Sequence, residues 1–203
     1  MGRPPSITNE TLIRAAREVF VRDGALGSTK EIAQRAGISE AALFKRYTRK
    51  ADLFVAAMTP PPVDIDAILA RARSLDDPRA AIARIAEDIL AYFRFALPMV
   101  IPMISNPLIG LEGVRAAFGD NAVAMLAAGV AEYLETEAAA GRITCPSPFP
   151  AAGLLVMGAH TLAQFEVMGL HDIPIGPDGV RALTDALWNG LAPKSPGPKE
   201  PRS

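Results

Sequence analysis

The sequence predicts an all-α protein with a small N-terminal part and a larger helical body, and three observations support this. Apolar residues recur at spacings of three and four, the helical period, in successive segments along the 203 residues. No apolar–polar alternation of any length indicates a β-strand. Alanine is abundant and aromatic residues make up only 6% of the chain, which favours helices that pack closely through small side chains.

Four short helices are expected in the N-terminal part, over residues 8–22, 29–36, 40–47 and 50–58. Thr8 is suited to cap the first helix, because its hydroxyl can accept from free N–H groups of the first turn, and Asp23-Gly24 ends that helix. Ser28 or Thr29 caps the second helix, and Glu31 is placed as the capping-box partner of Ser28.

The body follows the helix-breaking run Thr59-Pro60-Pro61-Pro62. Its expected helices cover residues 65–74, a long segment that Pro78 opens and that Pro98 kinks or ends, and residues 104–119, 121–140, 149–168 and 177–191. The tail, residues 193–203, holds little that it can bury and is expected to be disordered. We therefore divide the chain into domains at residues 1–55 and 56–192, with the tail beyond them.

Composition and charge limit the class of protein. Half of the residues are hydrophobic, the first ten do not resemble a secretory leader, and prolines interrupt the most apolar run, so we expect a cytoplasmic protein without a membrane span. The single cysteine, Cys145, excludes an intramolecular disulfide and fits a reducing compartment. Residues 1–55 carry ten Lys and Arg against six Asp and Glu, a net +4 in a chain of net −1, so the remainder carries −5. A basic head on an acidic body is typical of a protein that binds a polyanion, although a solvated surface gives the same pattern.

Residues 29–47 have the spacing of two helices that cross over a short turn. Ala33 is small where the second helix would pass, Gly37 falls at the corner where a left-handed conformation is needed, and Ser39 caps the second helix. A helix presented in this way, followed by Lys45 and Arg46, fits the width of a DNA major groove. The alternative is an ordinary αα-corner inside a helical bundle.

Residues 8–55 resemble the N-terminal domain of the TetR family of bacterial transcriptional regulators. The family signature, T/S-x-x-I-A-x-x-A-G-V-S-x-G-x-L-Y-x-H-F-x-x-K-x-x-L, stands here as TKEIAQRAGISEAALFKRY over residues 29–47, with Lys50 and Leu53 in register. The resemblance implies a three-helix helix-turn-helix DNA-binding domain followed by a helical ligand-binding and dimerisation domain.

Four departures from the signature bear on the DNA contacts. Phe44 replaces a Tyr whose hydroxyl meets a phosphate in the family, so that hydrogen bond should be absent here. Arg46 replaces His and Tyr47 replaces Phe, and we hypothesise that this pair restores a phosphate contact. Ala41 replaces Gly and places a methyl group toward the groove. These departures affect the operator contacts rather than the fold.

The resemblance also implies which residues meet DNA. The expected phosphate contacts are Ser28, Ser39, Tyr47 and Lys50. The candidates for base edges are Lys30, Glu40, Ala41, Ala42, Lys45 and Arg46, because Lys and Arg donate to guanine, Glu accepts from cytosine and Ala meets a thymine methyl. The full candidate DNA-binding set is Ser28, Thr29, Lys30, Ser39, Glu40, Ala41, Ala42, Phe44, Lys45, Arg46, Tyr47 and Lys50.

The body is expected to dimerise and to bind an effector. In the family the last two long helices form a four-helix interface between two copies, and the matching segments here are residues 149–168 and 177–191. The resemblance further implies a pocket for a small organic effector, and the apolar candidate lining predicts that this effector is apolar, meaning uncharged or weakly polar. Its candidate lining is Tyr92, Phe93, Met99, Met103, Met125, His160 and Gln164; ordinary core packing is the alternative for each of them.

Catalysis is disfavoured by the sequence. Two His, one Cys and no Ser-His-Asp spacing give no reactive constellation, and His160 and His171 lie too far apart for a metal-ligand pair. We expect neither a cofactor nor a metal. The sequence therefore favours a homodimeric repressor that binds a palindromic operator in double-stranded DNA and is released by an effector. The alternatives are a DNA-binding regulator without a small-molecule effector and a helical small-molecule-binding protein that is not an enzyme.

Overall fold

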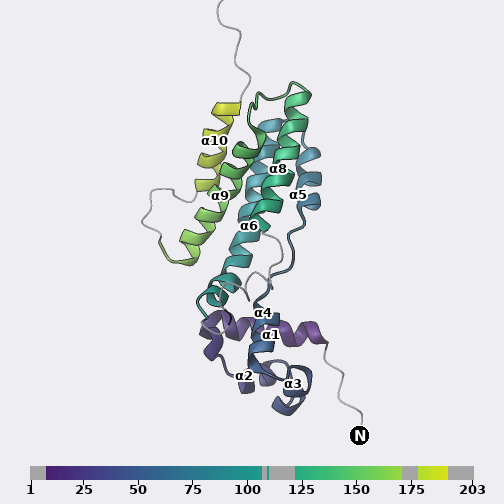
Figure 1. The fold of residues 1–203 in the computed structure, drawn as a ribbon, viewed down its shortest axis with the longest axis vertical. Helices are drawn as coiled ribbons and strands as arrows, with labels where there is room; N and C mark the ends of the chain where they lie inside the picture. Colours follow the sequence, from purple (N-terminus) through teal and green to yellow (C-terminus); the bar gives the residue numbers. More distant parts are fainter. Residues whose placement is uncertain (1–7, 107–108, 110–121, 171–177, 192–203) are drawn as a thin grey trace, which may run out of the picture. The chain divides into compact units, whose positions relative to one another are not determined.

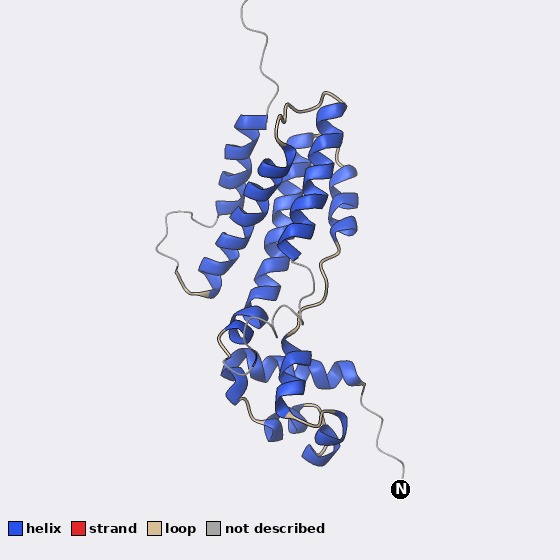
Figure 2. Ribbon diagram, viewed as in Figure 1, coloured by secondary structure: helices blue, strands red, loops and turns tan. Residues whose placement is uncertain are grey.

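The structure is a computed structural model that describes residues 8–106, 109, 122–170 and 178–191. Every regular element in these ranges is a helix and none is a strand, which confirms the all-α fold class (Figure 2). The helices, labelled in Figure 1, are α1 (Asn9–Asp23), the 3-10 helix η1 (Gly24–Leu26), α2 (Thr29–Arg35), α3 (Glu40–Arg46), α4 (Lys50–Met58), α5 (Ile65–Arg73), α6 (Pro78–Ile104), α8 (Ala122–Ala139), α9 (Pro148–Val167) and α10 (Gly179–Leu191).

The chain forms two compact units. The N-terminal unit comprises Met1–Pro62 and Phe95–Gly119, and the second unit comprises Val63–Arg94 and Asp120–Ser203. The expected division placed all of α6 with the body, whereas the C-terminal part of α6 groups with the N-terminal unit. Met99 and Met103 explain this difference, because both are fully buried in the core of that unit. A functional boundary at residue 55 stays a prediction.

The core of the N-terminal unit packs α1 against α2, α3 and α4. Phe20 of α1 meets Phe54 of α4 edge to face, with ring centroids 5.0 Å apart. Ile32 of α2 and Leu43 of α3 are fully buried in the same cluster. Each of these helices is too short to be stable alone in water, so this shared core is what fixes their positions.

Three of the predicted N-caps are confirmed. The hydroxyl oxygens of Thr8, Ser28 and Ser39 each accept a hydrogen bond from the backbone N–H three residues later, at 3.3, 3.3 and 3.2 Å. The second half of the predicted capping box is wrong. The carboxylate of Glu31 does not turn back to the backbone of Ser28; it accepts hydrogen bonds from Arg22 and Arg35. Two guanidinium donors bind the carboxylate more strongly than one neutral N–H.

Gly37 adopts the left-handed conformation that the corner between α2 and α3 requires, with φ of +70°. The N–H of Ile38 then donates to the carbonyl of Ala33 at 3.0 Å and closes the end of α2. This turn sets the direction in which α3 leaves the end of α2.

Gly37→Ala is expected to lower the free energy of unfolding by about 1–2 kcal/mol, because Cβ clashes with the carbonyl oxygen in this conformation. Gly37→Asn should lose less, since Asn tolerates left-handed backbone. Urea denaturation of the three proteins compares these losses. Equal stability of Gly37→Ala and the wild type would contradict the assignment.

Helix α6 passes through Pro98 and Pro102 and ends only at Ile104, so the expectation that Pro98 could end the helix is wrong. Burial of Leu97, Met99 and Met103 holds this segment in a helical path despite the missing N–H groups. The helix expected over residues 104–119 lies almost wholly outside the described residues. The same holds for the expected disorder of residues 193–203.

In the second unit, α8 lies beside α9, α9 beside α10, and α5 beside α8 (Figure 1). Gly129 lets α5 approach α8 closely, since an added Cβ would lie 2.5 Å from Cγ1 of Ile65. Ion pairs tie α6 to its neighbours at Arg71–Asp88 (α5), Arg94–Glu166 (α9) and Arg79–Asp185 (α10). Gly141, at φ of +72°, follows the end of α8.

Candidate functional site

Helix α3 exposes one face of the N-terminal unit. Leu43 anchors its buried side, with no exposed surface, whereas Glu40, Ala41, Phe44 and Lys45 are exposed. These four positions recur at spacings of one and four, so they share one side of the helix. Ala42 is half-buried. The structure therefore places three candidate base readers, Glu40, Ala41 and Lys45, on one face, with Ala42 at its edge, whereas Arg46 at the end of α3 lies outside these four positions.

The two capping serines keep a hydrogen-bond donor available. Each hydroxyl oxygen of Ser28 and Ser39 accepts from a backbone N–H, and both side chains are exposed. A hydroxyl can accept and donate at once. Each of these serines can therefore cap its helix and donate its proton to a phosphate oxygen.

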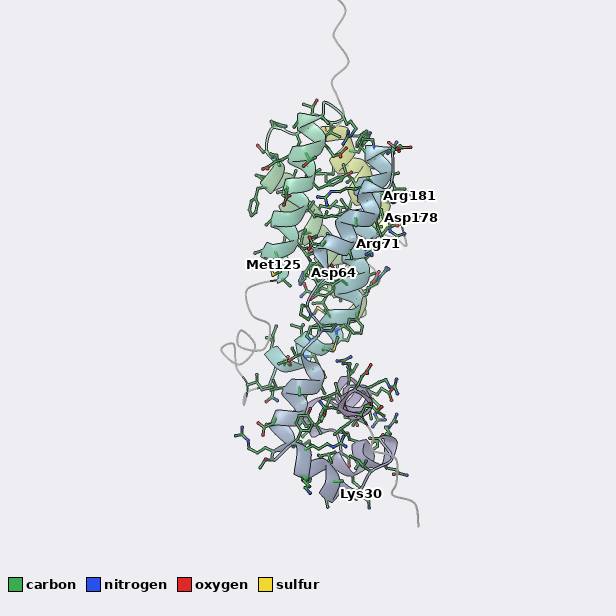
Figure 3. The ribbon with its side chains drawn as sticks, turned by 90° about the vertical axis from the view of Figure 1, so that its right-hand side faces the viewer. Lys30, Asp64, Arg71, Met125, Asp178 and Arg181 are labelled. Carbon is green, nitrogen blue, oxygen red and sulfur yellow. The ribbon has the colours of Figure 1, made fainter. Side chains whose placement is uncertain are left out.

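The basic residues fall into two groups. Arg22 and Arg35 are held by acids on α1, its C-terminus and α2, and Arg49 pairs with Asp52 at 2.6 Å. Within the part of the chain that the structure describes, Lys30, Lys45 and Lys50 form no ion pair. Lys30 lies at the lower edge of its unit in Figure 3. The lysines of α2, α3 and α4 are thus available for an external anion.

The paired arginines act on the acids around them. Hydrogen bonds from Arg22 and Arg35 lower the pKa of the Glu31 carboxyl below its ordinary value. The guanidinium of Arg49 lowers the pKa of Asp52 in the same way. These acids stay ionised at neutral pH and neutralise their arginines, so the net basic charge of the unit belongs mainly to other cations.

The positions that depart from the family signature are also visible. Phe44 is 39% exposed on the outer side of α3, where its ring offers no donor. The hydroxyl of Tyr47 donates to Oδ1 of Asn9 at 3.2 Å, so a phosphate would have to replace Asn9 as its acceptor. Arg46 is exposed at the end of α3.

One contact of the site was missed by sequence reasoning. The hydroxyl of Thr29, the first residue of α2, donates to Oε1 of Glu40, the first residue of α3, at 2.6 Å. The two residues are eleven apart in the chain, and no local pattern links them. Only the crossing of the two helices brings them together.

The candidate effector residues divide between the two units. The rings of Phe93 and His160 meet edge to face, with centroids 4.9 Å apart. The ring centroid of Tyr92 lies 5.5 Å from that of Phe93. Gln164 is half-buried and follows His160 by one turn of α9. Met99 and Met103 instead fill the core of the N-terminal unit. Met125 is exposed on α8. Ring contacts therefore join three of the seven candidates, and Gln164 lies one helical turn from one of them.

Burial changes the titration of this cluster. It raises the pKa of Tyr92 and lowers the pKa of His160, because an apolar environment disfavours the charged form of each. Both groups are therefore neutral at pH 7.

We expect the stability of the protein to fall as pH drops through the region below the pKa of an unfolded histidine, about 6.5. The unfolded chain binds a proton on His160 there before the folded chain does, so protonation favours unfolding. Melting temperatures between about pH 7.5 and about pH 5.5 measure the effect, which His160→Gln should reduce. An unchanged pH dependence in that variant would rule out His160 as the cause.

An apolar groove with a volume of about 620 Å³ runs between α9 and α10. Leu154 and Met157 on its α9 side are 66% and 49% exposed, and Leu183 and Leu187 line its α10 side. None of the candidate effector residues lines it. Two further exposed apolar side chains, Phe149 and Met168, lie at the two ends of α9.

The crossed pair α2–α3, packed on α1 and α4, forms a helix-turn-helix, the motif by which one class of DNA-binding proteins enters the major groove. Residues 12–57 match the family described as bacterial regulatory proteins, tetR family. Residues 12–57 are therefore similar to the N-terminal domain of the TetR family, and the chain shares the fold of a TetR-family regulator over 91% of its length. Regulators of this family are generally DNA-binding proteins and not enzymes.

Solved structures support the fold over nearly the full length. A proposed TetR-family transcriptional regulator from Mesorhizobium loti superposes with a TM-score of 0.71 at 18% identity, over 91% of this chain and 96% of that one. The regulator FadR from Bacillus subtilis, in complex with stearoyl-CoA, gives 0.65 at 14% identity over 90% and 99%. NalD, the secondary repressor of the MexAB-OprM efflux pump in Pseudomonas aeruginosa, gives 0.62 at 16% over 92% and 97%. Among curated proteins, none matches this chain.

Two other kinds of site were searched for. Among the described residues, no group of three or more His, Cys, Asp or Glu gathers as metal ligands would. None of the described helices combines the length and hydrophobicity needed to cross a membrane.

Proposed function

We propose that this protein is a homodimeric transcriptional repressor that binds a palindromic operator through α2, α3 and the start of α4, and that a small organic effector releases it. The observation that carries the proposal is the exposed face of α3 together with Lys30, Lys45 and Lys50, which form no ion pair with any residue that the structure describes. Ion pairs with acids neutralise Arg22, Arg35 and Arg49, whereas the charges of these lysines are left for an external anion such as a phosphate.

DNA recognition would be divided between two sets of side chains. Lys50, Ser28 and Ser39 are suited to phosphates, because one supplies a free ammonium and the others supply hydroxyl protons. The outer face of α3 would enter the major groove and present side chains to base edges there. Phosphate contacts set the position, and base contacts set the sequence.

The apolar groove between α9 and α10 supports the proposed dimerisation. A single helix-turn-helix unit buries too little surface to select one genomic site, so two are needed. The groove and the exposed Leu154 and Met157 form a continuous apolar surface, which a second copy of α9 and α10 would cover. Two-fold symmetry of the dimer would then require a palindromic operator.

The effector would bind beside Tyr92, Phe93, His160 and Gln164. This cluster combines aromatic surface with neutral polar groups, which suits an uncharged or weakly polar molecule. The B. subtilis neighbour is in complex with stearoyl-CoA, so the fold accommodates an organic ligand in that protein. If effector and DNA favour different conformers of the dimer, each weakens the binding of the other.

The test is selection of the purified protein on random double-stranded DNA at a fixed salt concentration. A palindrome with half-site centres about one helical turn or somewhat more apart is the expected result. Weak binding that is equal for all sequences would refute the specific regulator. A screen for compounds that raise the melting temperature and also dissociate the complex tests the effector separately. If operator binding is strong and no compound dissociates it, the regulator without a small-molecule effector is favoured.

A further inference from the structure

We propose that Thr29 is a positioning residue that fixes the carboxylate of Glu40, and that Glu40 thereby selects one cytosine in each operator half-site. The inference rests on the proposed function, and it assigns a base and a mechanism to one contact. Its structural basis is the hydrogen bond from the Thr29 hydroxyl to Oε1 of Glu40, at 2.6 Å.

This hydrogen bond links the side chain of the first residue of α2 to that of the first residue of α3. Thr29 directly follows the cap Ser28, and Glu40 directly follows the cap Ser39. A hydroxyl–carboxylate distance of 2.6 Å is within the range of a charge-assisted hydrogen bond, which is stronger than one between neutral groups. The side chain of Glu40 therefore has a preferred orientation across the start of α3, although it is exposed.

The carboxylate lies on the face that would meet the bases. Glu40 shares that face with Ala41, Phe44 and Lys45, opposite the buried Leu43. An ionised carboxylate only accepts hydrogen bonds, and Thr29 occupies one of its acceptor positions. Oε2 and the remaining position on Oε1 stay available for a donor from outside the protein.

The chemistry of the major groove limits which base can supply that donor. Guanine and thymine present acceptors there, which repel a carboxylate. Adenine presents an amino group beside the acceptor N7, whereas cytosine presents its N4 amino group without an adjacent acceptor. A carboxylate that accepts from the base edge is therefore best matched by cytosine, and it discriminates against the others by repulsion as well as by attraction.

Thr29 is needed because DNA repels this side chain. The phosphates repel a negatively charged side chain. Without a hydrogen bond to hold it, the Glu40 side chain would rotate out of the groove toward solvent. The hydroxyl of Thr29 opposes the rotation. Because its proton is used in this bond, Thr29 acts on DNA through Glu40 and is not itself a phosphate donor, in contrast to Ser28 and Ser39.

The experiment measures base preference rather than affinity alone. Wild-type protein is used to select an operator, and each position is then replaced by the other three bases and its dissociation constant measured at fixed salt. Variants are Glu40→Gln, Thr29→Val, which removes the hydroxyl at nearly constant shape, and Thr29→Ser, which retains it. Glu10→Gln, at an exposed acid in the first turn of α1, is the matched control for loss of one negative charge.

We expect the wild type to prefer cytosine at one position of each half-site by about 5- to 150-fold, the range of one good base contact. Glu40→Gln should lose that preference, shift it toward adenine and bind non-operator DNA more tightly. Thr29→Val should reduce the preference by about two- to tenfold, the range of one hydrogen bond, and Thr29→Ser should restore it. Glu10→Gln should leave the preference unchanged.

Two results would overturn the inference in different ways. If Glu40→Gln and Thr29→Val keep every base preference and only lower the melting temperature, the contact serves the packing of α2 on α3 and nothing more. The regulator itself would then still stand, because the wild type selects an operator. If the wild type selects no sequence at all, the proposed function fails first and this inference fails with it.

Discussion

Leu154→Glu is expected to convert the dimer to a monomer and to weaken operator binding by about 100-fold or more, since the two heads then bind independently. Leu154 is 66% exposed and lines the groove between α9 and α10. In the proposed dimer it is buried against the partner, where an unpaired carboxylate is strongly disfavoured. Sedimentation and DNA binding measure the two effects on the same sample.

Leu75→Glu is the matched control for this variant. Leu75 is also an exposed leucine, at 42%, but it follows α5 and does not line the groove. The control should remain dimeric and bind the operator normally. A dimeric Leu154→Glu protein with normal affinity would show that another surface holds the two copies together.

Lys50→Ala is expected to weaken binding to operator and to unrelated DNA alike, by about tenfold or more for each half-site, the contribution of one hydrogen bond to a charged group. Lys50 is the first residue of α4 and forms no ion pair among the described residues, so its ammonium is free to meet a phosphate. Loss of one phosphate contact should also reduce the slope of affinity against salt by about 1 per protomer. Titration of DNA at several salt concentrations measures both.

Arg181→Ala, which removes one exposed positive charge from α10, is the control for the change in net charge. It should leave both the affinity and the salt slope close to those of the wild type. If Lys50→Ala relaxed the preference for a single base and left the salt slope unchanged, Lys50 would be a base reader instead of a phosphate contact.

Local features of the fold were predictable from the sequence because they depend on residues within one turn of each other. The caps Thr8, Ser28 and Ser39 and the left-handed Gly37 are of this kind, and the structure has them as expected. A hydroxyl three residues before a free N–H meets it in almost any helical context. The signature over residues 29–47 extends this agreement to the crossing of α2 and α3.

The path of α6 was not predictable in the same way. Proline has a strong local tendency to end a helix, and the sequence near Pro98 shows no interaction that would stabilise the helix against it. The stabilising interaction is the burial of Met99 and Met103 in a core whose other residues lie more than forty positions earlier in the chain. The same burial gives Met99 and Met103 a core-packing role, which was the alternative to lining an effector pocket.

The sequence by itself determined the fold class, the helix-turn-helix and the excess of basic residues in the N-terminal part. Only the tertiary structure decided which of those cations form ion pairs: Arg22, Arg35 and Arg49 meet acids, whereas Lys30, Lys45 and Lys50 meet none in the described ranges of the chain. It also decided that Thr29 meets Glu40. The physical reason is range: helix ends and turns are set by neighbours in the chain, whereas a charge pair forms only after packing brings two side chains within a few ångströms.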